Sequence, residues 1–160
     1  MKKLFMLLAI TGLLFTSCSK DDDNSDTNSV KFGSELVNTP YSFLIDYDGY
    51  YGIFITSVSD ITKPVTGKPT AIQFLINFRD GVIKEGEYTY SDDMATDYDP
   101  EKHYFDAVFR FNGKNWTQGD MKNGKIKITK SGSDYIFEYS FTTDNKSVTG
   151  YYKGSVTNVY

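Results

Sequence analysis

Cys18 is the residue whose chemistry the sequence defines most sharply. It carries the only thiol of the chain and follows an apolar segment that runs from Leu4 to Phe15. A polar run begins directly after it, with Ser19-Lys20-Asp21-Asp22-Asp23. One cysteine cannot form an intramolecular disulfide or a cysteine-based zinc site. Because this is the single cysteine and it lies at the boundary between an apolar and a polar segment, we expect its sulfur to be covalently modified.

Acid–base catalysis has few candidate residues. His103 is the single histidine, and the chain lacks the Gly-x-Ser-x-Gly motif of serine hydrolases. A glycosidase would need two carboxylates separated by about 5 or 6.5–9.5 Å. The candidates for such a pair are Glu85, Glu87, Asp92, Asp93, Asp106 and Glu138. Acids that alternate with aromatic residues usually face solvent, so we expect a protein without a catalytic site.

An acidic loop from 91 to 101 is the one candidate metal site. Calcium prefers several oxygen ligands, and carboxylates are dense in this loop. They belong to Asp92, Asp93, Asp97 and Asp99. The spacing differs from the Asp-x-Asp-x-Asp-Gly calcium loop, and Pro100 interrupts it. We expect at most a calcium site here, with a solvated acidic loop as the alternative, and no other cofactor.

Aromatic residues near predicted turns are candidate ligand-binding residues. Trp116 lies in the polar stretch 113–119 beside Asn115, and Tyr98 and Tyr104 flank another predicted turn. A planar ring next to an amide suits a sugar, because the ring stacks on the sugar while the amide donates and accepts hydrogen bonds. The alternative is structural: Trp116 folds back as a lid on one end of a barrel or sandwich.

Composition and charge narrow the class of protein. The 160 residues fit one domain, and the aromatic content of 16% favours strands. The formal net charge is −4, and loss of residues 1–17 would remove Lys2 and Lys3 and leave −6. A protein with this charge cannot neutralise phosphates, so nucleic acid is excluded as a partner.

The first 17 residues have the three parts of an export signal. Lys2 and Lys3 precede the apolar run, and the small residues Thr16 and Ser17 follow it. The run is shorter than the ~20 residues that span a bilayer. We expect residues 1–17 to be a signal peptide, residues 18–30 to form a flexible acidic tether, and residues 31–160 to fold as one domain.

Two motifs around Cys18 resemble those of lipoproteins. Phe15-Thr16-Ser17-Cys18 resembles the bacterial lipoprotein box, although Phe15 replaces the usual leucine. The run Cys18-Ser19-Lys20-Asp21-Asp22-Asp23 is similar to the start of Bacteroidetes surface lipoproteins, in which it signals export to the cell surface. The resemblance implies a lipid on Cys18 and an outer-membrane, surface-exposed location. The alternatives are an ordinary cleaved signal and a solvated acidic spacer.

Alternating polarity from residue 31 onward predicts an all-β domain. Short runs of apolar residues at every second position are separated by turn residues such as Asp48-Gly49 and Asn112-Gly113. One predicted face holds Ile72, Phe74, Ile76 and Phe78, the next Phe105, Ala107, Phe109 and Phe111, and a third Tyr135, Phe137, Tyr139 and Phe141. We expect seven to nine strands in an antiparallel meander that closes as a barrel or a two-sheet sandwich.

Segments 124–141 and 148–156, with Gly86-Glu87-Tyr88-Thr89-Tyr90-Ser91, resemble small Bacteroidetes lipoproteins with calycin-like or sandwich domains. Many such families have no assigned activity. Our leading hypothesis is a non-catalytic binding module for a glycan or an envelope protein. The alternatives are a calycin-like barrel that carries a small apolar ligand against Phe74, Phe109 and Phe137, a structural subunit of a surface complex, and an enzyme.

Overall fold

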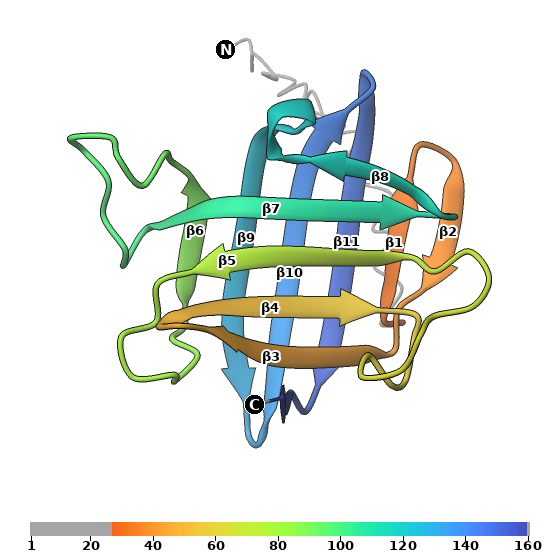
Figure 1. Ribbon diagram of the computed structural model, residues 1–160, viewed down its shortest axis with the longest axis horizontal. Coiled ribbons are helices and arrows are strands. Elements are labelled where there is room, and N and C mark those ends of the chain that lie inside the picture. The colour runs from red at the N-terminus through yellow and green to blue at the C-terminus, as the bar shows by residue number, and fades with distance from the viewer. Residues whose placement is uncertain (1–26, 160) are drawn as a thin grey trace, which may run out of the picture.

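The computed structural model describes residues 27–159 and folds them into one β-sheet of twelve strands (Figure 1). Cys18 and the expected signal peptide lie outside the described residues. Within the part that is described, no helix has the length and apolar character needed to cross a bilayer. The strands are β1 (Ser29–Phe32), β2 (Glu35–Asn38), β3 (Tyr41–Tyr47), β4 (Tyr50–Thr56), β5 (Ala71–Ile76), β6 (Gly86–Tyr90), β7 (His103–Phe111), β8 (Lys114–Thr117), β9 (Lys122–Ser131), β10 (Asp134–Thr143), β11 (Lys146–Gly154) and β12 (Thr157–Val159), with a 3-10 turn at Gln118–Asp120.

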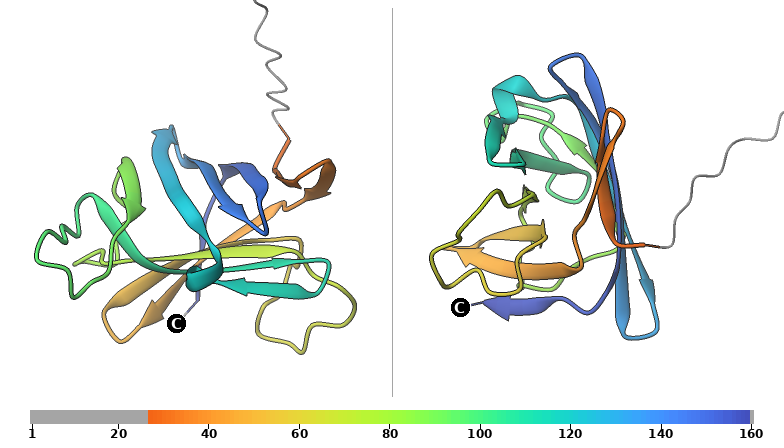
Figure 2. Two further views of the ribbon diagram at one scale, coloured as in Figure 1. Left: turned by 90° about the horizontal axis from the view of Figure 1, so that it is seen from above. Right: turned by 90° about the vertical axis from the view of Figure 1, so that its right-hand side faces the viewer.

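The sheet curls over itself into two layers that form a half-barrel (Figure 2). Its strand order is β12-β3-β4-β5-β7-β6-β9-β10-β11-β1-β2, and β8 pairs with β7 off this path. We call β12, β3, β4, β5, β7 and β8 the first sheet and the remaining strands the second sheet. Figure 1 shows the strands of one layer crossing those of the other. The corner is β6, which pairs with β7 in parallel and with β9 in antiparallel fashion.

The all-β prediction is confirmed, but the predicted count of seven to nine strands is wrong. The additional strands are short: β1, β2 and β8 have four residues each and β12 has three. Segments of this length contain too few alternations to be recognised as strands. In particular, β8 lies within the stretch that we expected to be a loop, and β1 begins at Ser29, inside the expected tether.

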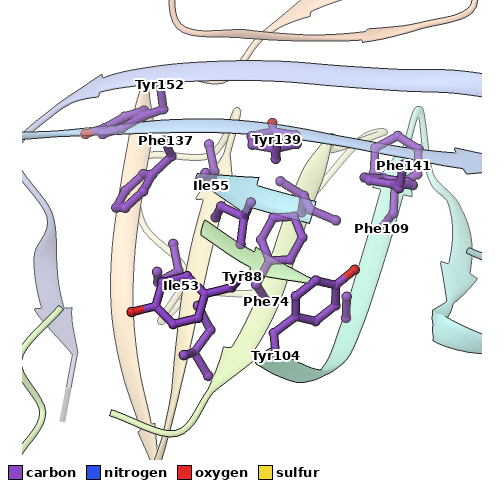
Figure 3. Close-up of a cluster of buried hydrophobic side chains, with 14 of the residues drawn as sticks. Ile53, Ile55, Phe74, Tyr88, Tyr104, Phe109, Phe137, Tyr139, Phe141 and Tyr152 are labelled. Carbon is purple, nitrogen blue, oxygen red and sulfur yellow. The ribbon is translucent and has the colours of Figure 1, made fainter. Parts of the chain in front are cut away.

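Large side chains from both layers fill the space between them (Figure 3). The predicted inward face of β5 is confirmed, because Ile72, Phe74, Ile76 and the following Phe78 are at most 1% exposed. From the second sheet, Ile126 and Ile128 of β9 and Phe137 and Phe141 of β10 are also buried. Burial of this apolar surface is the main force that holds the two layers together.

The face predicted for β7 requires one correction. Phe105 was expected to point inward, but Tyr104 takes that place and is 3% exposed. A register shift between Leu75 and Ile76 in the pairing of β5 with β7 reverses the alternation at this point. Phe105 consequently contacts the ring of Tyr50, with ring centroids 4.8 Å apart.

Predicted hairpin turns are confirmed by their backbone conformation. Asp48-Gly49 and Asn112-Gly113 have positive φ at both residues, as tight two-residue β-hairpin turns require. Asp144-Asn145, between β10 and β11, has the same geometry. At the first turn the carboxylate of Asp46 also accepts a hydrogen bond of 3.0 Å from the Gly49 amide.

The start of the described chain is fixed to the second sheet. The side-chain amide of Asn28 donates to the Lys153 carbonyl at 3.0 Å, and its oxygen accepts from the Lys153 amide at 2.7 Å. These side-chain hydrogen bonds lie just beyond the end of the antiparallel ladder of β1 with β11, which stops at Ser29 and Tyr151. The described chain therefore begins on the second sheet.

Candidate functional site

The interior rings that we considered for a carried ligand are packed against other side chains. Phe74, Phe109 and Phe137 have no exposed surface. Their rings contact those of Tyr104, Phe141 and Tyr152, at centroid distances of 5.3, 5.2 and 5.8 Å (Figure 3). None of the surface hollows described below is lined by any of the three, so the candidate sites lie on the outside of the sheet.

Trp116 points inward from β8 and covers one end of the core. It is 4% exposed and stacks on Phe109 with 5.3 Å between ring centroids. Its indole N–H donates to Oδ2 of Asp144 at 2.9 Å, and the ammonium of Lys114 lies 2.7 Å from the same oxygen. These hydrogen bonds, first from Lys114 and then from Trp116, lower the pKa of the Asp144 carboxyl. The indole thus occupies the lid position of the alternative interpretation.

The other expected ligand-binding residues lie apart. Asn115 is exposed on the outer side of β8, where its Oδ1 accepts a 2.6 Å hydrogen bond from Nε of Arg110. Tyr104 is buried at the opposite end of β7, about 20 Å away along the strand at ~3.3 Å per residue. Tyr98 is half-buried in the loop that precedes β7. The structure does not bring these residues together with Trp116 into one site.

His103 and the acidic loop form local turns. Nδ1 of His103 accepts from the Asp99 amide at 2.9 Å, and the His103 amide donates to the Asp99 carbonyl at 2.8 Å. Oδ1 of Asp92 accepts from the Met94 amide at 2.9 Å. Between residues 27 and 159, no three His, Cys, Asp or Glu side chains lie close enough together to hold a metal ion. Asp93 and Asp97 are therefore not part of such a group either.

The outer side of the first sheet carries exposed apolar and aromatic residues, and we call it the aromatic face. The strand register places its members on the side opposite the core. They are Tyr41, Tyr47, Tyr50, Phe54, Leu75 and Val108. The three tyrosines are 40%, 44% and 41% exposed. Apolar side chains displayed together in this way mark surfaces that bind another molecule.

Tyr47 and Tyr50 form a fixed pair at one end of the aromatic face. They are direct cross-strand partners on either side of the Asp48-Gly49 turn. The amide of Gln73 reaches across Gly52 and donates to the Tyr47 hydroxyl at 2.9 Å. Gly52 makes this possible, because a Cβ there would lie 2.9 Å from both Nε2 of Gln73 and Cε2 of Tyr47. The ring of Tyr47 is therefore oriented before any ligand arrives.

A groove of about 280 Å³ lies at the other end of the aromatic face. Its floor consists of outward side chains of β4, β5 and β7, and its roof is the loop 57–70. The lining residues are Phe54, Thr56, Val58, Ile61, Val65, Pro69, Ala71, Gln73, Val108 and Arg110. Most are apolar, and Arg110 is the one charged residue among them. We call this feature the loop groove.

The outer side of the second sheet has a different composition, and we call it the charged face. Its hollow of about 470 Å³ is lined by side chains that include Lys31, Lys125, Lys127, Glu87 and Glu138. Lys127 lies between the two glutamates in the strand register and forms an ion pair of 3.2 Å with Glu138. The two acids are both exposed, with a cation between them.

A third hollow, of about 470 Å³, lies where the described chain begins. It is lined by Thr27, Asn28, Asn38, Pro40, Asp134 and Lys153. It is shallow and polar, and its residues serve to hold the first described residues against β11. We assign it no ligand.

Neither the aromatic face nor the loop groove was predicted from the sequence. One signal was present in β3. Its outer side carries Tyr41, Phe43, Ile45 and Tyr47 at every second position, and its inner side carries the apolar Leu44. A strand that is apolar on both sides is covered on both sides or binds something on its outer side. The groove has no comparable signal, because its roof is an irregular loop.

Comparisons with known proteins provide no relative: no family model, curated protein or solved structure matches the chain significantly.

Proposed function

We propose that the protein is a non-catalytic binding domain, held at the outer membrane by a lipid on Cys18 and exposed on the cell surface, which binds a glycan through its aromatic face. The observation that carries this proposal is the Tyr47–Tyr50 pair. Both residues are more than two-fifths exposed and are direct cross-strand partners in β3 and β4.

The chemistry of these rings matches that of a sugar. A pyranose ring has one apolar C–H side and a rim of hydroxyl groups, and tyrosine likewise combines an apolar ring with a polar hydroxyl. The Gln73 amide holds the Tyr47 hydroxyl in place, which reduces the side-chain entropy lost on binding. Asp106, on this side of the first sheet, adds a carboxylate acceptor for sugar hydroxyls.

The arrangement of the layers supports the proposed anchoring. The described chain begins at the second sheet, through Asn28 and β1, whereas the aromatic face belongs to the first sheet in the other layer (Figure 2). A lipid anchor at Cys18 would therefore join the molecule on the side away from the aromatic face. The proposed binding surface then stays free of the tether.

The proposal is tested by glycan binding with the mature, lipidated protein in nanodiscs. We expect a polysaccharide array to yield at least one ligand, and Tyr47→Ala or Tyr50→Ala to weaken its affinity by about tenfold, the cost of one well-packed aromatic contact. Tyr151→Ala, on the charged face, is the matched control and should leave affinity unchanged. Equal loss in all three variants, or capture of an envelope protein with no glycan bound, would contradict the proposal.

The proposed location has its own tests. Mass spectrometry of the native protein should find Cys18 as the first residue, with its sulfur acylated. Protease added to intact cells should digest the domain if it is on the surface. A free thiol at Cys18, or a domain protected until the cells are lysed, would overturn this part of the proposal.

A further inference from the structure

We propose that the loop groove is a second binding site, for a small carboxylate with an unbranched or aromatic apolar tail of about eight carbon atoms. Its charged end, at Arg110, lies apart from the Tyr47–Tyr50 pair of the proposed glycan site, although Gln73 belongs to both. The proposal rests on three observations: an apolar lining, an arginine that pairs with no acid of residues 27–159, and a small volume.

The groove is a built feature, because both ends of its roof are fixed. Ser57 and Thr70 pair at the base of the loop: the Ser57 amide donates to the Thr70 carbonyl at 2.9 Å, and the Thr70 amide donates to the Ser57 hydroxyl at 3.1 Å. Near the tip, Asp60 accepts from the Thr62 amide at 3.0 Å and pairs with Lys63 at 2.7 Å. These hydrogen bonds and the ion pair hold the loop 57–70, whose apolar side chains cover the floor of the groove.

The lining gives the ligand its apolar part. The roof contributes Val58, Ile61, Val65 and Pro69, and the floor contributes Phe54, Ala71 and Val108. Val65 and Val108 remain 42% and 38% exposed, so apolar surface at the mouth of the groove is still in contact with water. A hydrocarbon tail that covers it gains about 25 cal/mol for each Å² removed from water.

Arg110 favours a ligand with a negative charge. Its Nε donates to Asn115, which orients the guanidinium and leaves the terminal nitrogens available. Lysines form the ion pairs found between residues 27 and 159, and no Asp or Glu in that range pairs with Arg110. A guanidinium binds a carboxylate through two parallel N–H···O hydrogen bonds, so an anionic head group completes its coordination.

The volume limits the size of the ligand. The groove measures about 280 Å³, just below the ~300–1,000 Å³ of typical small-molecule sites. At ~30 Å³ for a unit the size of a water molecule, this volume corresponds to about nine non-hydrogen atoms. One short chain or one aromatic ring fits, whereas a lipid with two long acyl chains does not.

The loop groove and the tyrosine pair occupy different rows of the first sheet. Arg110, Ala71 and Thr56 lie in register with Tyr41, at the start of β3. Tyr47 and Tyr50 lie at its end, six residues along the strand and therefore about 20 Å away. Gln73 belongs to both sites, because it lines the groove and also binds the Tyr47 hydroxyl, whereas Arg110 belongs to the groove alone. Arg110→Gln should therefore leave glycan binding intact.

The test is isothermal titration of octanoate and of 1-octanol into the mature protein in nanodiscs, with empty nanodiscs as the blank. We expect saturable binding of octanoate, about tenfold or more tighter than that of 1-octanol, because the hydrogen bonds to a charged group are lost with the alcohol. Arg110→Gln should remove this preference and leave octanol binding unchanged. Arg79→Gln, the same change at the other arginine of the chain, is the matched control and should preserve the preference.

A second variant tests the position of the tail. Ala71→Leu adds volume to the floor of the groove without entering the core, and it should weaken octanoate and octanol alike. Circular dichroism confirms that each variant is folded. The proposal is overturned if octanoate binds no better than octanol, if Arg79→Gln has the effect of Arg110→Gln, or if Ala71→Leu binds both probes as the wild type does.

Discussion

The aromatic face and the charged face are the outer sides of two halves of one sheet, yet they obey different rules. On the charged face, Lys125 and Lys127 alternate with the buried Ile126 and Ile128, so that each strand has one dry and one wet side. On the aromatic face, three tyrosines and Val108 remain exposed above an equally apolar core. The outer side of the second sheet is therefore more polar than the outer side of the first sheet.

This contrast points to the first sheet as the functional side of the molecule. In the second sheet, polar and apolar residues alternate as is typical of antiparallel sheets with one solvated side. The first sheet departs from that pattern at Tyr47, Tyr50 and Val108, which are 44%, 41% and 38% exposed. Exposed apolar side chains grouped on one sheet are expected where another molecule covers them.

The largest predicted loss of stability distinguishes aromatic residues on the core side of the first sheet from those on its outer side. Trp116→Ala should lower the free energy of unfolding by about 3–5 kcal/mol, because it empties a packed position against Phe109. Tyr47→Ala, on the outer side, should cost less than about 1 kcal/mol. Urea unfolding measures both. Similar losses in the two variants would mean that the outer rings serve stability.

Gly150→Ala should have the next largest effect. The ring of Tyr139 lies directly over Gly150 in the second sheet, and an added Cβ would collide with it. Tyr139 is 4% exposed and cannot move into solvent without loss of packing, so we expect destabilisation of about 1–3 kcal/mol. Gly119→Ala is the matched control, because nothing lies within 4 Å of a Cβ there. A stable Gly150→Ala variant would show that the second sheet is packed more loosely than the burial of Tyr139 implies.

Gly52→Ala tests the outer side in the same manner, with a different expected result. The new methyl group meets the side chains of Tyr47 and Gln73, which are free to move outward, so stability should change by less than about 1 kcal/mol. The hydrogen bond between them should break, and glycan affinity should fall by several-fold. Thermal unfolding and titration on the same sample separate the two effects. A large loss of stability, or full affinity, would contradict the positioning role of Gly52.

The sequence predicts the interior of this molecule better than its outer surfaces. Alternation located the buried faces of β5 and β10, and turn residues located the hairpins at Asp48-Gly49 and Asn112-Gly113. It missed the reversal at Tyr104, because a β-bulge depends on the partner strand. It also left open whether Trp116 is displayed or buried, because β8 is too short to reveal its direction.

The candidate site was harder to predict for a related reason. The members of the aromatic face come from several strands, and their neighbours are set by register rather than by spacing along the chain. Tyr47 and Gln73 are 26 positions apart but share a hydrogen bond. The loop groove likewise depends on how the segment 57–70 folds over β4 and β5, which no periodic pattern encodes.

The smallest predicted effect concerns pH. Hydrogen bonds from Lys114 and Trp116 lower the pKa of Asp144 below its ordinary value of 3.8. The contribution of Asp144 to stability is therefore fully present above that value and is lost as the pH falls through the lowered pKa. Asp144→Asn should be less stable than the wild type at pH 7, with a difference that shrinks below pH 3.8. A constant difference across this range would show that the carboxylate charge is not what holds Trp116.

Whether the aromatic face is the binding surface is decided by NMR mapping. With a glycan from the array added to the isotope-labelled protein, we expect the shift changes to concentrate on Tyr47, Tyr50, Gln73 and their neighbours in β3, β4 and β5. Shift changes centred instead on Lys31, Lys125 and Lys127 would place binding on the charged face and contradict the proposed function.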